Sequence, residues 1–260
     1  MVRFGICTDF EHIEGVAAAG FDYIEPKTYD IAMASEQEFA DMQALVKKSG
    51  IGCEAANFFY PLHFKVVGED INKKEIFAYI EKAVMRLNIL GVKNITVGSG
   101  GPRYSPEGFS KVRAELQFGE QIRYLGELAA KNGMTVAIEP LRFASCNIIN
   151  TIAQGAALSK LVGLSNVKTM ADINQMTGAD DYVGQIYEHA EYIGHLHTID
   201  VENNCYPVDP DDIVQIEVLR AYLAVNPGGR VSVEGAPFTT VEVAKKSLET
   251  LKSIVAKVRG

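Results

Sequence analysis

The sequence lacks several features that would point to particular classes of protein. Its 25 Lys and Arg residues are outnumbered by 33 Asp and Glu residues, which gives a formal net charge of -8, and a surface of that sign does not attract nucleic acid. No apolar run approaches the roughly 18 to 20 residues that a membrane helix needs. The first residues, Met1–Cys7, lack the basic start and the long apolar core of a secretion signal. We therefore expect neither nucleic acid nor a membrane as a partner.

Paired cysteines and internal linkers are missing as well. The four cysteines, at positions 7, 53, 146 and 205, form no CxxC motif, and reduced thiols in apolar runs pack as small hydrophobic groups. No low-complexity segment or change of composition divides the 260 residues. We expect one domain that spans residues 1–260 in the reducing cytoplasm.

What the sequence does contain is a regular alternation of short β-forming runs with longer amphipathic segments. The predicted strands are Arg3–Cys7, Asp22–Glu25, Gly52–Ala56, Asn94–Val97, Thr135–Leu141, Val167–Asp172, Ile193–Thr198 and Arg230–Glu234. The predicted helices are Phe10–Ala19, Ser35–Ser49, Lys73–Leu90, Pro106–Lys131, Asn147–Leu161, Asp180–Ala190, Asp212–Val225 and Thr239–Val258. Eight such units with apolar strands predict an α/β fold, the closed (β/α)8 barrel. The alternative is an open doubly wound sheet, but Cys7-Thr8-Asp9-Phe10 stands where its glycine-rich fingerprint would follow the first strand.

Four consecutive predicted strands end in a polar side chain. The fifth strand stops at Glu139, because Pro140 cannot supply the next hydrogen-bond donor of the ladder. The next three strands end in Asp172, His197 and Glu234. In a closed barrel the carboxyl ends of all strands meet at one mouth, where active sites lie. We therefore expect these four side chains to face one another.

Three carboxylates and one imidazole at one mouth would repel each other unless a divalent cation lay between them. We predict that Glu139, Asp172, His197 and Glu234 bind one divalent metal ion. The set has no thiolate, so Mn²⁺ is favoured, and Mg²⁺, Co²⁺ and Zn²⁺ stay open. Taken singly, each residue also has an ordinary interpretation, as a strand-end carboxylate near helix amides, a helix N-cap at Asp172 or a hydrogen-bonded core histidine.

The residues around these positions resemble a known family. Ile138-Glu139-Pro140-Leu141, Asp172-Ile173-Asn174-Gln175-Met176, Gly194-His195-Leu196-His197-Thr198 and Val233-Glu234-Gly235 look like the four metal-site motifs of the xylose isomerase-like TIM barrel superfamily of sugar phosphate isomerases and epimerases. That family includes ketose 3-epimerases and inositol-pathway enzymes. The turns Gly20–Glu25 and Gly91–Lys93 are similar to those of the family too, so the resemblance extends over nearly the whole chain.

The resemblance implies a metal-dependent isomerase or epimerase of carbohydrate metabolism, with a small carbohydrate as its partner. By resemblance, Glu139 and Glu234 act as catalytic acid and base as well as metal ligands. A metal ion that chelates a carbonyl and the neighbouring hydroxyl acidifies the C–H between them, and two carboxylates on opposite faces can then remove and return the proton. Dimers and tetramers are common in the family, which makes a homo-oligomer the corresponding expectation.

The residues that would contact the substrate depart from the ketose 3-epimerase pattern. Gln175 stands where those enzymes usually have a histidine, Arg142-Phe143-Ala144 where they have a glutamate, and Asn203 where they have an arginine. Polar or charged side chains near the predicted rim are Glu25, Lys27, Asn57, His63, Arg103 and Arg142. Arg103, after a glycine-rich loop, could hold a phosphate or a carboxylate. The predicted substrate contacts are Asn57, Arg103, Arg142, Gln175 and Asn203.

Three other functions fit the same barrel. A dehydratase of the inositol-pathway type could use the same metal site, since an enolate can expel a hydroxyl group. An abasic-site endonuclease would need several strand-end histidines, but of the five histidines in the chain only His195 and His197 lie at such an end. The acidic net charge also argues against a protein that binds DNA. A sugar-binding barrel that has lost the reaction would explain the altered substrate contacts.

Overall fold

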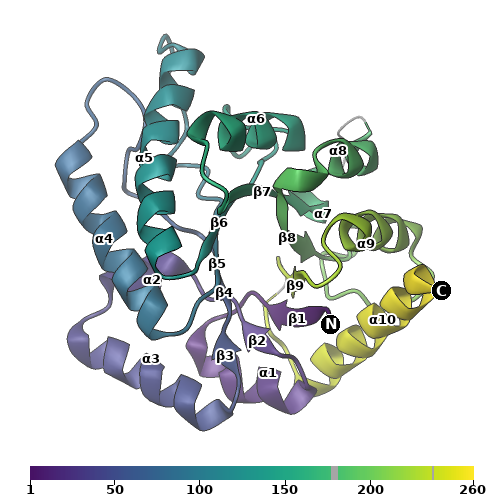
Figure 1. The fold of residues 1–260 in the computed structure, drawn as a ribbon. Coiled ribbons are helices and arrows are strands. Elements are labelled where there is room, and N and C mark those ends of the chain that lie inside the picture. The colour runs from purple at the N-terminus through teal and green to yellow at the C-terminus, as the bar shows by residue number, and fades with distance from the viewer. Residues whose placement is uncertain (177–180, 236) are drawn as a thin grey trace.

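The strands of the chain form one ring with the helices outside it. The computed structural model describes residues 1–176, 181–235 and 237–260. Figure 1 shows short strands around a central axis and an outer layer of helices, with both termini on the same side of this view. The strands are β1 (Arg3–Ile6), β2 (Tyr23–Ile24), β3 (Gly52–Cys53), β4 (Ala55–Ala56), β5 (Asn94–Val97), β6 (Thr135–Ile138), β7 (Val167–Asp172), β8 (Ile193–Thr198) and β9 (Arg230–Val233).

All strand pairs in the sheet are parallel, in the order β3-β2-β1-β9-β8-β7-β6-β5-β4. The first strand pairs with the last, Ile6 opposite Val233. The two strands at the ends of this order are consecutive in the chain, because Glu54 divides the predicted third strand into β3 and β4. The ring is therefore closed by hydrogen bonds everywhere except at Glu54, where the covalent chain completes it, and the prediction of a (β/α)8 TIM barrel is confirmed.

Most of the outer helices begin where a side chain caps them, whereas α1 and α2 begin without a side-chain cap. They are α1 (Ile13–Ala19), α2 (Thr28–Met33), α3 (Glu36–Ser49), α4 (Lys73–Ile89), α5 (Lys111–Lys131), α6 (Ile152–Val162), α7 (Ile173–Met176), α8 (Tyr182–Glu188), α9 (Ile213–Val225) and α10 (Val241–Arg259), with 3-10 turns at Phe10–His12 and Ala190–Tyr192. Ser35 and Glu38 form the capping box that the sequence predicted.

Two predicted helices begin later in the chain than expected, for the same local reason. The helices expected from Pro106 and Asn147 begin at Lys111 and Ile152, because Ser110 and Thr151 accept the free amides of their first turns. Two short helices, α2 and α7, lie in segments that carried no helical periodicity. The helix expected over Asp180–Ala190 runs from Tyr182 to Glu188, and Asp180 lies outside the described residues.

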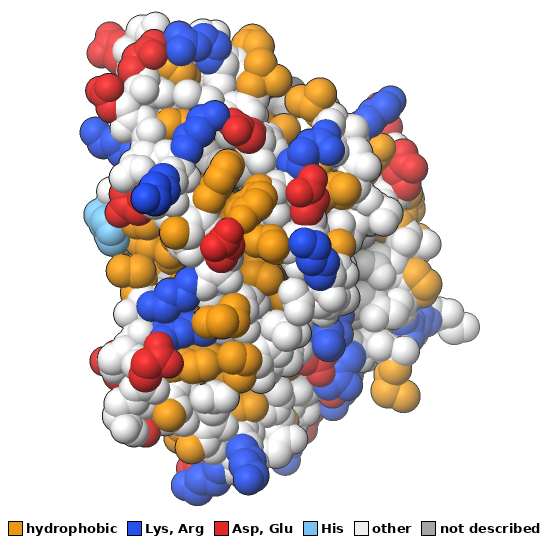
Figure 2. All heavy atoms as spheres, turned by 60° about the vertical axis from the view of Figure 1, so that its left-hand side comes forward, with side chains coloured by type: hydrophobic (Ala, Val, Ile, Leu, Met, Phe, Trp, Pro, Cys, Tyr) orange, Lys and Arg blue, Asp and Glu red, His pale blue; other side chains and the backbone are white. Residues whose placement is uncertain are grey.

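The outer surface carries charges of both signs. On the face shown in Figure 2, which brings forward the side of α3, α4 and α5, Lys and Arg side chains alternate with Asp and Glu and with hydrophobic side chains. Among the hydrophobic ones exposed on α4 and α5 are Met85, Ile89 and Leu116. In the part of the chain that the structure describes, every helix is too short or too polar to cross a membrane.

The interruption of the third strand is tied to the two strands that close the ring. Glu54 accepts hydrogen bonds from Arg3 Nε and Arg230 Nε, each at 2.9 Å. These arginines are the first residues of β1 and β9, so the three side chains lie at the amino end of the barrel, away from the predicted site. The Glu54 side chain is 18% exposed, which leaves it partly screened by water.

We predict that Glu54→Gln lowers the free energy of unfolding by about 1–2 kcal/mol, because the three charge-assisted hydrogen bonds from Arg3 and Arg230 weaken in a half-buried setting. Equilibrium unfolding in urea measures the change. Glu69→Gln is the matched control, since Glu69 pairs with Arg113 where both side chains are more than half exposed, and such pairs contribute little. Equal effects of the two substitutions would contradict the prediction.

Candidate metal centre and its pocket

The four predicted ligands meet at the carboxyl ends of four neighbouring strands. Asp172 and His197 lie within β7 and β8, and Glu139 and Glu234 directly follow β6 and β9. Asp172 is opposite His197 in the β7–β8 register. One ligand atom from each of the four residues lies within 4.8 Å of all the others. Sequence positions almost a hundred residues apart thus form one compact cluster.

The cluster is buried, and within the described part of the chain one of its oxygens has no hydrogen-bond partner. Glu139, Asp172 and His197 are at most 5% exposed, and the Glu234 side chain is 17% exposed. His197 Nδ1 lies 2.8 Å from Glu234 Oε2 and 3.7 Å from Asp172 Oδ2. Among the described residues, Asp172 Oδ2 has no hydrogen-bond partner. A buried carboxylate oxygen without a donor fits a cation as its missing partner.

Asp172 combines two of the interpretations that its sequence position allowed. Its other oxygen, Oδ1, accepts hydrogen bonds from the amides of Asn174 at 2.7 Å and Gln175 at 3.2 Å. These amides lie in the first turn of α7. One oxygen therefore holds the start of a helix while the other faces the cluster.

Burial and mutual charge shift the pKa values within the cluster in both directions. Burial, together with the carboxylates of Glu234 and Asp172, raises the pKa of Glu139 well above its ordinary value. Burial also raises the pKa of Glu234, against the opposing charge of His197. Burial alone would lower the pKa of His197, but the charges of Glu234 and Glu25 hold it well above its ordinary value. Without a cation, protons thus neutralise part of the negative charge.

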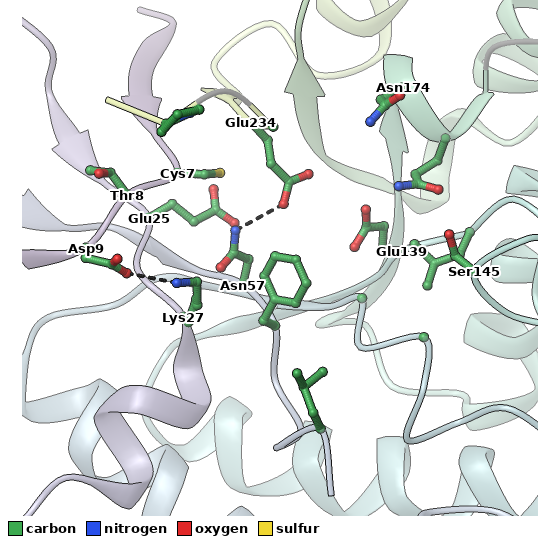
Figure 3. Close-up of a pocket in the computed structure, with 18 of the residues that line it drawn as sticks. Cys7, Thr8, Asp9, Glu25, Lys27, Asn57, Glu139, Ser145, Asn174 and Glu234 are labelled. Carbon is green, nitrogen blue, oxygen red and sulfur yellow. Dashed lines mark hydrogen bonds and ion pairs between the residues drawn. The ribbon is translucent and has the colours of Figure 1, made fainter. Parts of the chain in front are cut away.

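A pocket of about 660 Å³ opens over the cluster, a volume that suits a small-molecule ligand. Its lining includes Cys7, Lys27, Asn57, Glu139, Asn174 and Glu234. Figure 3 shows the carboxylates of Glu139 and Glu234 pointing into the same space from opposite sides. Asn57 Nδ2 donates to Glu234 Oε1 at 3.2 Å, which orients that carboxylate from the rim.

Two of the five predicted substrate contacts line the described pocket, and the others do not. Asn57 and Gln175 line the pocket. Arg142 is exposed and donates to Asn174 Oδ1 at 2.9 Å, and Asn203 is exposed and folds back on Asp200. Neither of these two is among the described residues that line the pocket, and their contact with a substrate stays a prediction.

Arg103 lies behind the site. Its side chain is fully buried, and its guanidinium donates to the main-chain oxygens of Val97 at 3.3 Å and Glu139 at 2.5 Å and lies over the Phe118 ring. The guanidinium thus holds together the ends of β5 and β6. Two guanidinium nitrogens donate to main-chain carbonyls, Nε has no hydrogen-bond partner among the described residues, and Arg103 does not line the described pocket. A contact of Arg103 with a phosphate or carboxylate stays a prediction.

The glycine-rich loop after β5 makes room for the cluster. A Cβ added at Gly98 would lie 1.6 Å from Glu139 Oε2, and one at Gly100 would lie 2.4 Å from the main-chain oxygen of Ser145. At Gly101, by contrast, a Cβ would meet nothing within 4 Å. Gly98 is therefore the residue whose missing side chain allows the Glu139 carboxylate to occupy its position.

Other pocket residues carried too weak a signal in the sequence. His12 stacks on Phe238 with ring centroids 5.2 Å apart, and both line the pocket. Lys27 forms an ion pair with Asp9 at 3.2 Å, visible at the left of Figure 3. Of these four pocket residues, Lys27 alone was predicted at the rim, because it follows a strand end. Asp9, His12 and Phe238 come from loops and turns, and the direction of these segments depends on the closed barrel.

A buried acid lies on the far side of His197. Glu25, expected at the rim, lines the pocket but is fully buried. Its carboxylate lies within 3.0 Å of both His195 Nε2 and His197 Nε2. Burial alone would raise the pKa of Glu25, but the two imidazoles hold it well below its ordinary value. A carboxylate with such partners stays ionised in the interior.

The sequence is similar to a family of TIM barrels and to curated sugar epimerases. A sequence model of the family described as "Xylose isomerase-like TIM barrel" matches residues 13–254. The D-psicose 3-epimerase of Agrobacterium fabrum (strain C58 / ATCC 33970) is 30% identical over 194 residues, which are 72% of this chain and 66% of that protein. The 3-dehydro-D-guloside 4-epimerase of Escherichia coli (strain K12) is 24% identical over 171 residues, 62% of this chain and 63% of that protein. The chain thus matches slightly less than two thirds of the length of these curated relatives.

Solved structures share the barrel over almost the whole chain. A crystal structure of D-psicose 3-epimerase in the presence of D-fructose superposes with a TM-score of 0.80 at 23% identity, covering 99% of this chain and 98% of that one. The 3-keto-D-glucoside 4-epimerase of E. coli, in its apo form, gives a TM-score of 0.81 at 20% identity, covering 97% and 100%. At these identities the likeness is one of fold.

We predict that Gly98→Ala weakens the binding of a divalent cation by at least about 10-fold, because the added Cβ displaces the Glu139 carboxylate. Gly101→Ala, in the same loop and with open space around its Cβ, is expected to bind as the wild type does. Isothermal titration with Mn²⁺ compares the two. A Gly98→Ala protein with wild-type affinity would show that Glu139 does not take part in binding the metal.

Metal binding is expected to strengthen as the pH rises. His197 and Glu139 keep their protons to higher pH than usual, and a metal ion takes only the deprotonated forms, so protons and metal compete. Titrations with Mn²⁺ in buffers of different ionisation enthalpy, from about pH 6 to about pH 8, measure the protons released. Affinity that falls over this range, or binding without proton release, would contradict the prediction.

Proposed function

The chain belongs to the xylose isomerase-like TIM barrel family, and from this membership we propose that it is a divalent-metal-dependent epimerase or isomerase of a small, uncharged keto sugar. The single observation that carries the proposal is the convergence of Glu139, Asp172, His197 and Glu234 within 4.8 Å, with Glu139 and Glu234 lining one pocket. The curated relatives are named as epimerases of sugars or sugar derivatives, which supports the same class of reaction.

The four residues suit a divalent cation held by oxygen and nitrogen donors. Three carboxylates and one imidazole without a thiolate favour Mn²⁺, with Mg²⁺, Co²⁺ and Zn²⁺ as alternatives. The partnerless Asp172 Oδ2 and the space left by Gly98 support this fit. When bound, such an ion would polarise the substrate carbonyl and stabilise the negative charge of an enediolate.

Glu139 and Glu234 are proposed to carry the proton. They approach the pocket from opposite sides (Figure 3), so one can take a proton from one face of a carbon while the other returns a proton to the opposite face. Both have raised pKa values, first because of burial, which brings a carboxyl group closer to the range where it can both accept and donate at neutral pH.

The charges around the pocket favour an uncharged substrate. Of the described residues that line it, Lys27 is the one Lys or Arg, and its Nζ is already paired with Asp9 at 3.2 Å. The five residues outside the description, Thr177–Asp180 and Ala236, contain no cationic side chain. A phosphate group would therefore meet carboxylates without a free counter-charge. This observation favours a free sugar or a neutral derivative over a sugar phosphate.

The proposal predicts that the purified, metal-loaded protein exchanges a substrate hydrogen with deuterated water. NMR spectra of a panel of ketoses, each tested beside its phosphate ester, would show deuterium next to the carbonyl of an unphosphorylated sugar. Glu139→Gln and Glu234→Gln are each expected to slow this exchange by at least about 100-fold, since each removes one proton-transfer group. Glu69→Gln, at an exposed ion pair with Arg113 on the outer surface, is the control and is expected to exchange hydrogen as the wild type does.

The same samples decide between the proposed reaction and its alternatives. A product of unchanged mass indicates an epimerase or isomerase, whereas the loss of one water indicates a dehydratase. Metal analysis beside the exchange assay separates the two parts of the proposal. A wild-type protein that binds no divalent ion near stoichiometry, or that exchanges no hydrogen with any sugar in the panel, would overturn it.

A further inference from the structure

We propose that Glu25 is a positioning residue for the metal centre, which holds the His197 ring with Nδ1 toward the cluster and the Nε2 proton behind it. This role rests on the proposed function, because it concerns the same metal site. Glu25 belongs to a different strand end from the four ligands, directly after β2 (Tyr23–Ile24). It does not need to touch a substrate or the reacting atoms to act in this way.

The contacts of Glu25 use both of its oxygens. Oε1 lies 3.0 Å from His197 Nε2 and accepts a hydrogen bond from Thr96 Oγ1 at 3.1 Å. Oε2 lies 2.9 Å from His195 Nε2 and accepts a hydrogen bond from Ser232 Oγ at 2.5 Å. All five side chains are fully buried. Four donors from β5, β8 and β9 thus fix one carboxylate in one orientation.

The two nitrogens of His197 face different chemical surroundings. Nδ1 points at Glu234 and Asp172, the carboxylates of the cluster, while Nε2 points at Glu25. A neutral imidazole can offer a lone pair from one nitrogen only, and the other must carry the proton. An ionised carboxylate only accepts hydrogen bonds, so Glu25 holds the proton on Nε2 and leaves the lone pair of Nδ1 for a metal ion.

The carboxylate is itself held by a second layer of contacts. Tyr23 Oη lies 2.8 Å from Ser232 Oγ, and since the Ser232 hydroxyl donates to Glu25, the tyrosine hydroxyl is the donor to Ser232. Gly5, opposite Tyr23 in the β1–β2 register, leaves the space for that ring, because a Cβ there would lie 2.1 Å from it. The orientation of His197 is therefore set by packing deep in the barrel.

A separate metal ion between Glu25, His195 and His197 is a competing interpretation, because their ligand atoms also lie within 4.8 Å of one another. The hydrogen-bond pattern favours the positioning role. Both Nε2 atoms already lie 2.9–3.0 Å from a Glu25 oxygen, the distance of an N–H donor to a carboxylate. Each Glu25 oxygen also has a hydroxyl donor, Thr96 or Ser232, so no lone pair is left for an ion.

Metal affinity tests the proposal without use of the reaction. We expect Glu25→Ala to bind Mn²⁺ about 100-fold more weakly than the wild type and Glu25→Gln about 10-fold more weakly, since glutamine keeps one neutral acceptor. Thr96→Val and Ser232→Ala each remove one donor to Glu25 and should weaken binding by about 2- to 10-fold. Glu54→Gln, a carboxylate at the opposite end of the barrel bonded to two arginines, is the control and should bind as the wild type does.

A spectroscopic readout separates positioning from general destabilisation. In ¹⁵N-histidine-labelled protein loaded with Zn²⁺, which is diamagnetic, His197 of the wild type should show a protonated Nε2 and a metal-bound Nδ1. Glu25→Ala should lose the slowly exchanging Nε2 proton signal, and Glu54→Gln should keep it. If the role of Glu25 were merely structural, Glu25→Ala would lower the stability of the protein, as Glu54→Gln does, but the Nε2 proton signal would stay unchanged in the folded protein.

The outcomes are distinct. If Glu25→Gln and Glu25→Ala bind Mn²⁺ within twofold of the wild type, the positioning role is wrong while the metal site stands. If Glu25→Ala does not fold, Thr96→Val and Ser232→Ala decide, and wild-type affinity in both would overturn the role. If the wild type itself binds no metal, the proposed function fails and the positioning role fails with it. A second equivalent of metal bound near His195 would favour the competing interpretation and also overturn the proposal.

Discussion

Three carboxylates that converge on one imidazole in a buried barrel mouth are the constraint on which the rest of the structure depends. Negative charges within 4.8 Å of each other are unfavourable where water is scarce. The residues around the three carboxylates reduce this cost. His197 takes up charge, and Gly98 leaves the space that the Glu139 carboxylate fills. Arg103 binds the main chain of Glu139 from behind and fixes the strand end from which that carboxylate projects.

The sequence allowed a good prediction of those parts of the fold that depend on local chemistry. β5 and β7 begin and end at the predicted residues, because apolar runs bounded by loop residues define buried strands. The strand-end positions of Glu139 and Asp172 followed from the same pattern, and the barrel brings them together. That these residues bind a metal and transfer a proton stays a prediction, since geometry alone does not test it.

Other features depend on contacts that the sequence does not reveal. The break at Glu54 reflects hydrogen bonds with Arg3 and Arg230, which are distant in the chain. Arg103 follows a loop of glycines, whose direction is set only by the packed barrel, and so its inward course could not be predicted. Glu25 lines the pocket, as its position at a strand end suggested. Its full burial and its contacts with His195 and His197 depend on the packed barrel and could not be predicted.

Because Asp172 serves both the metal cluster and a helical turn, it restricts how the substrate specificity of such a site can change. One of its oxygens caps the turn that carries Asn174 and Gln175, and the other faces the metal cluster. Asn174 and Gln175 line the pocket. A change of specificity at these positions that shifts the backbone of the turn would also rotate a metal ligand. Adaptation there is restricted to exchanges of side chains on an unchanged backbone, whereas the loops that carry Asp9 and Phe238 are free of this coupling and offer the easier route to new substrates.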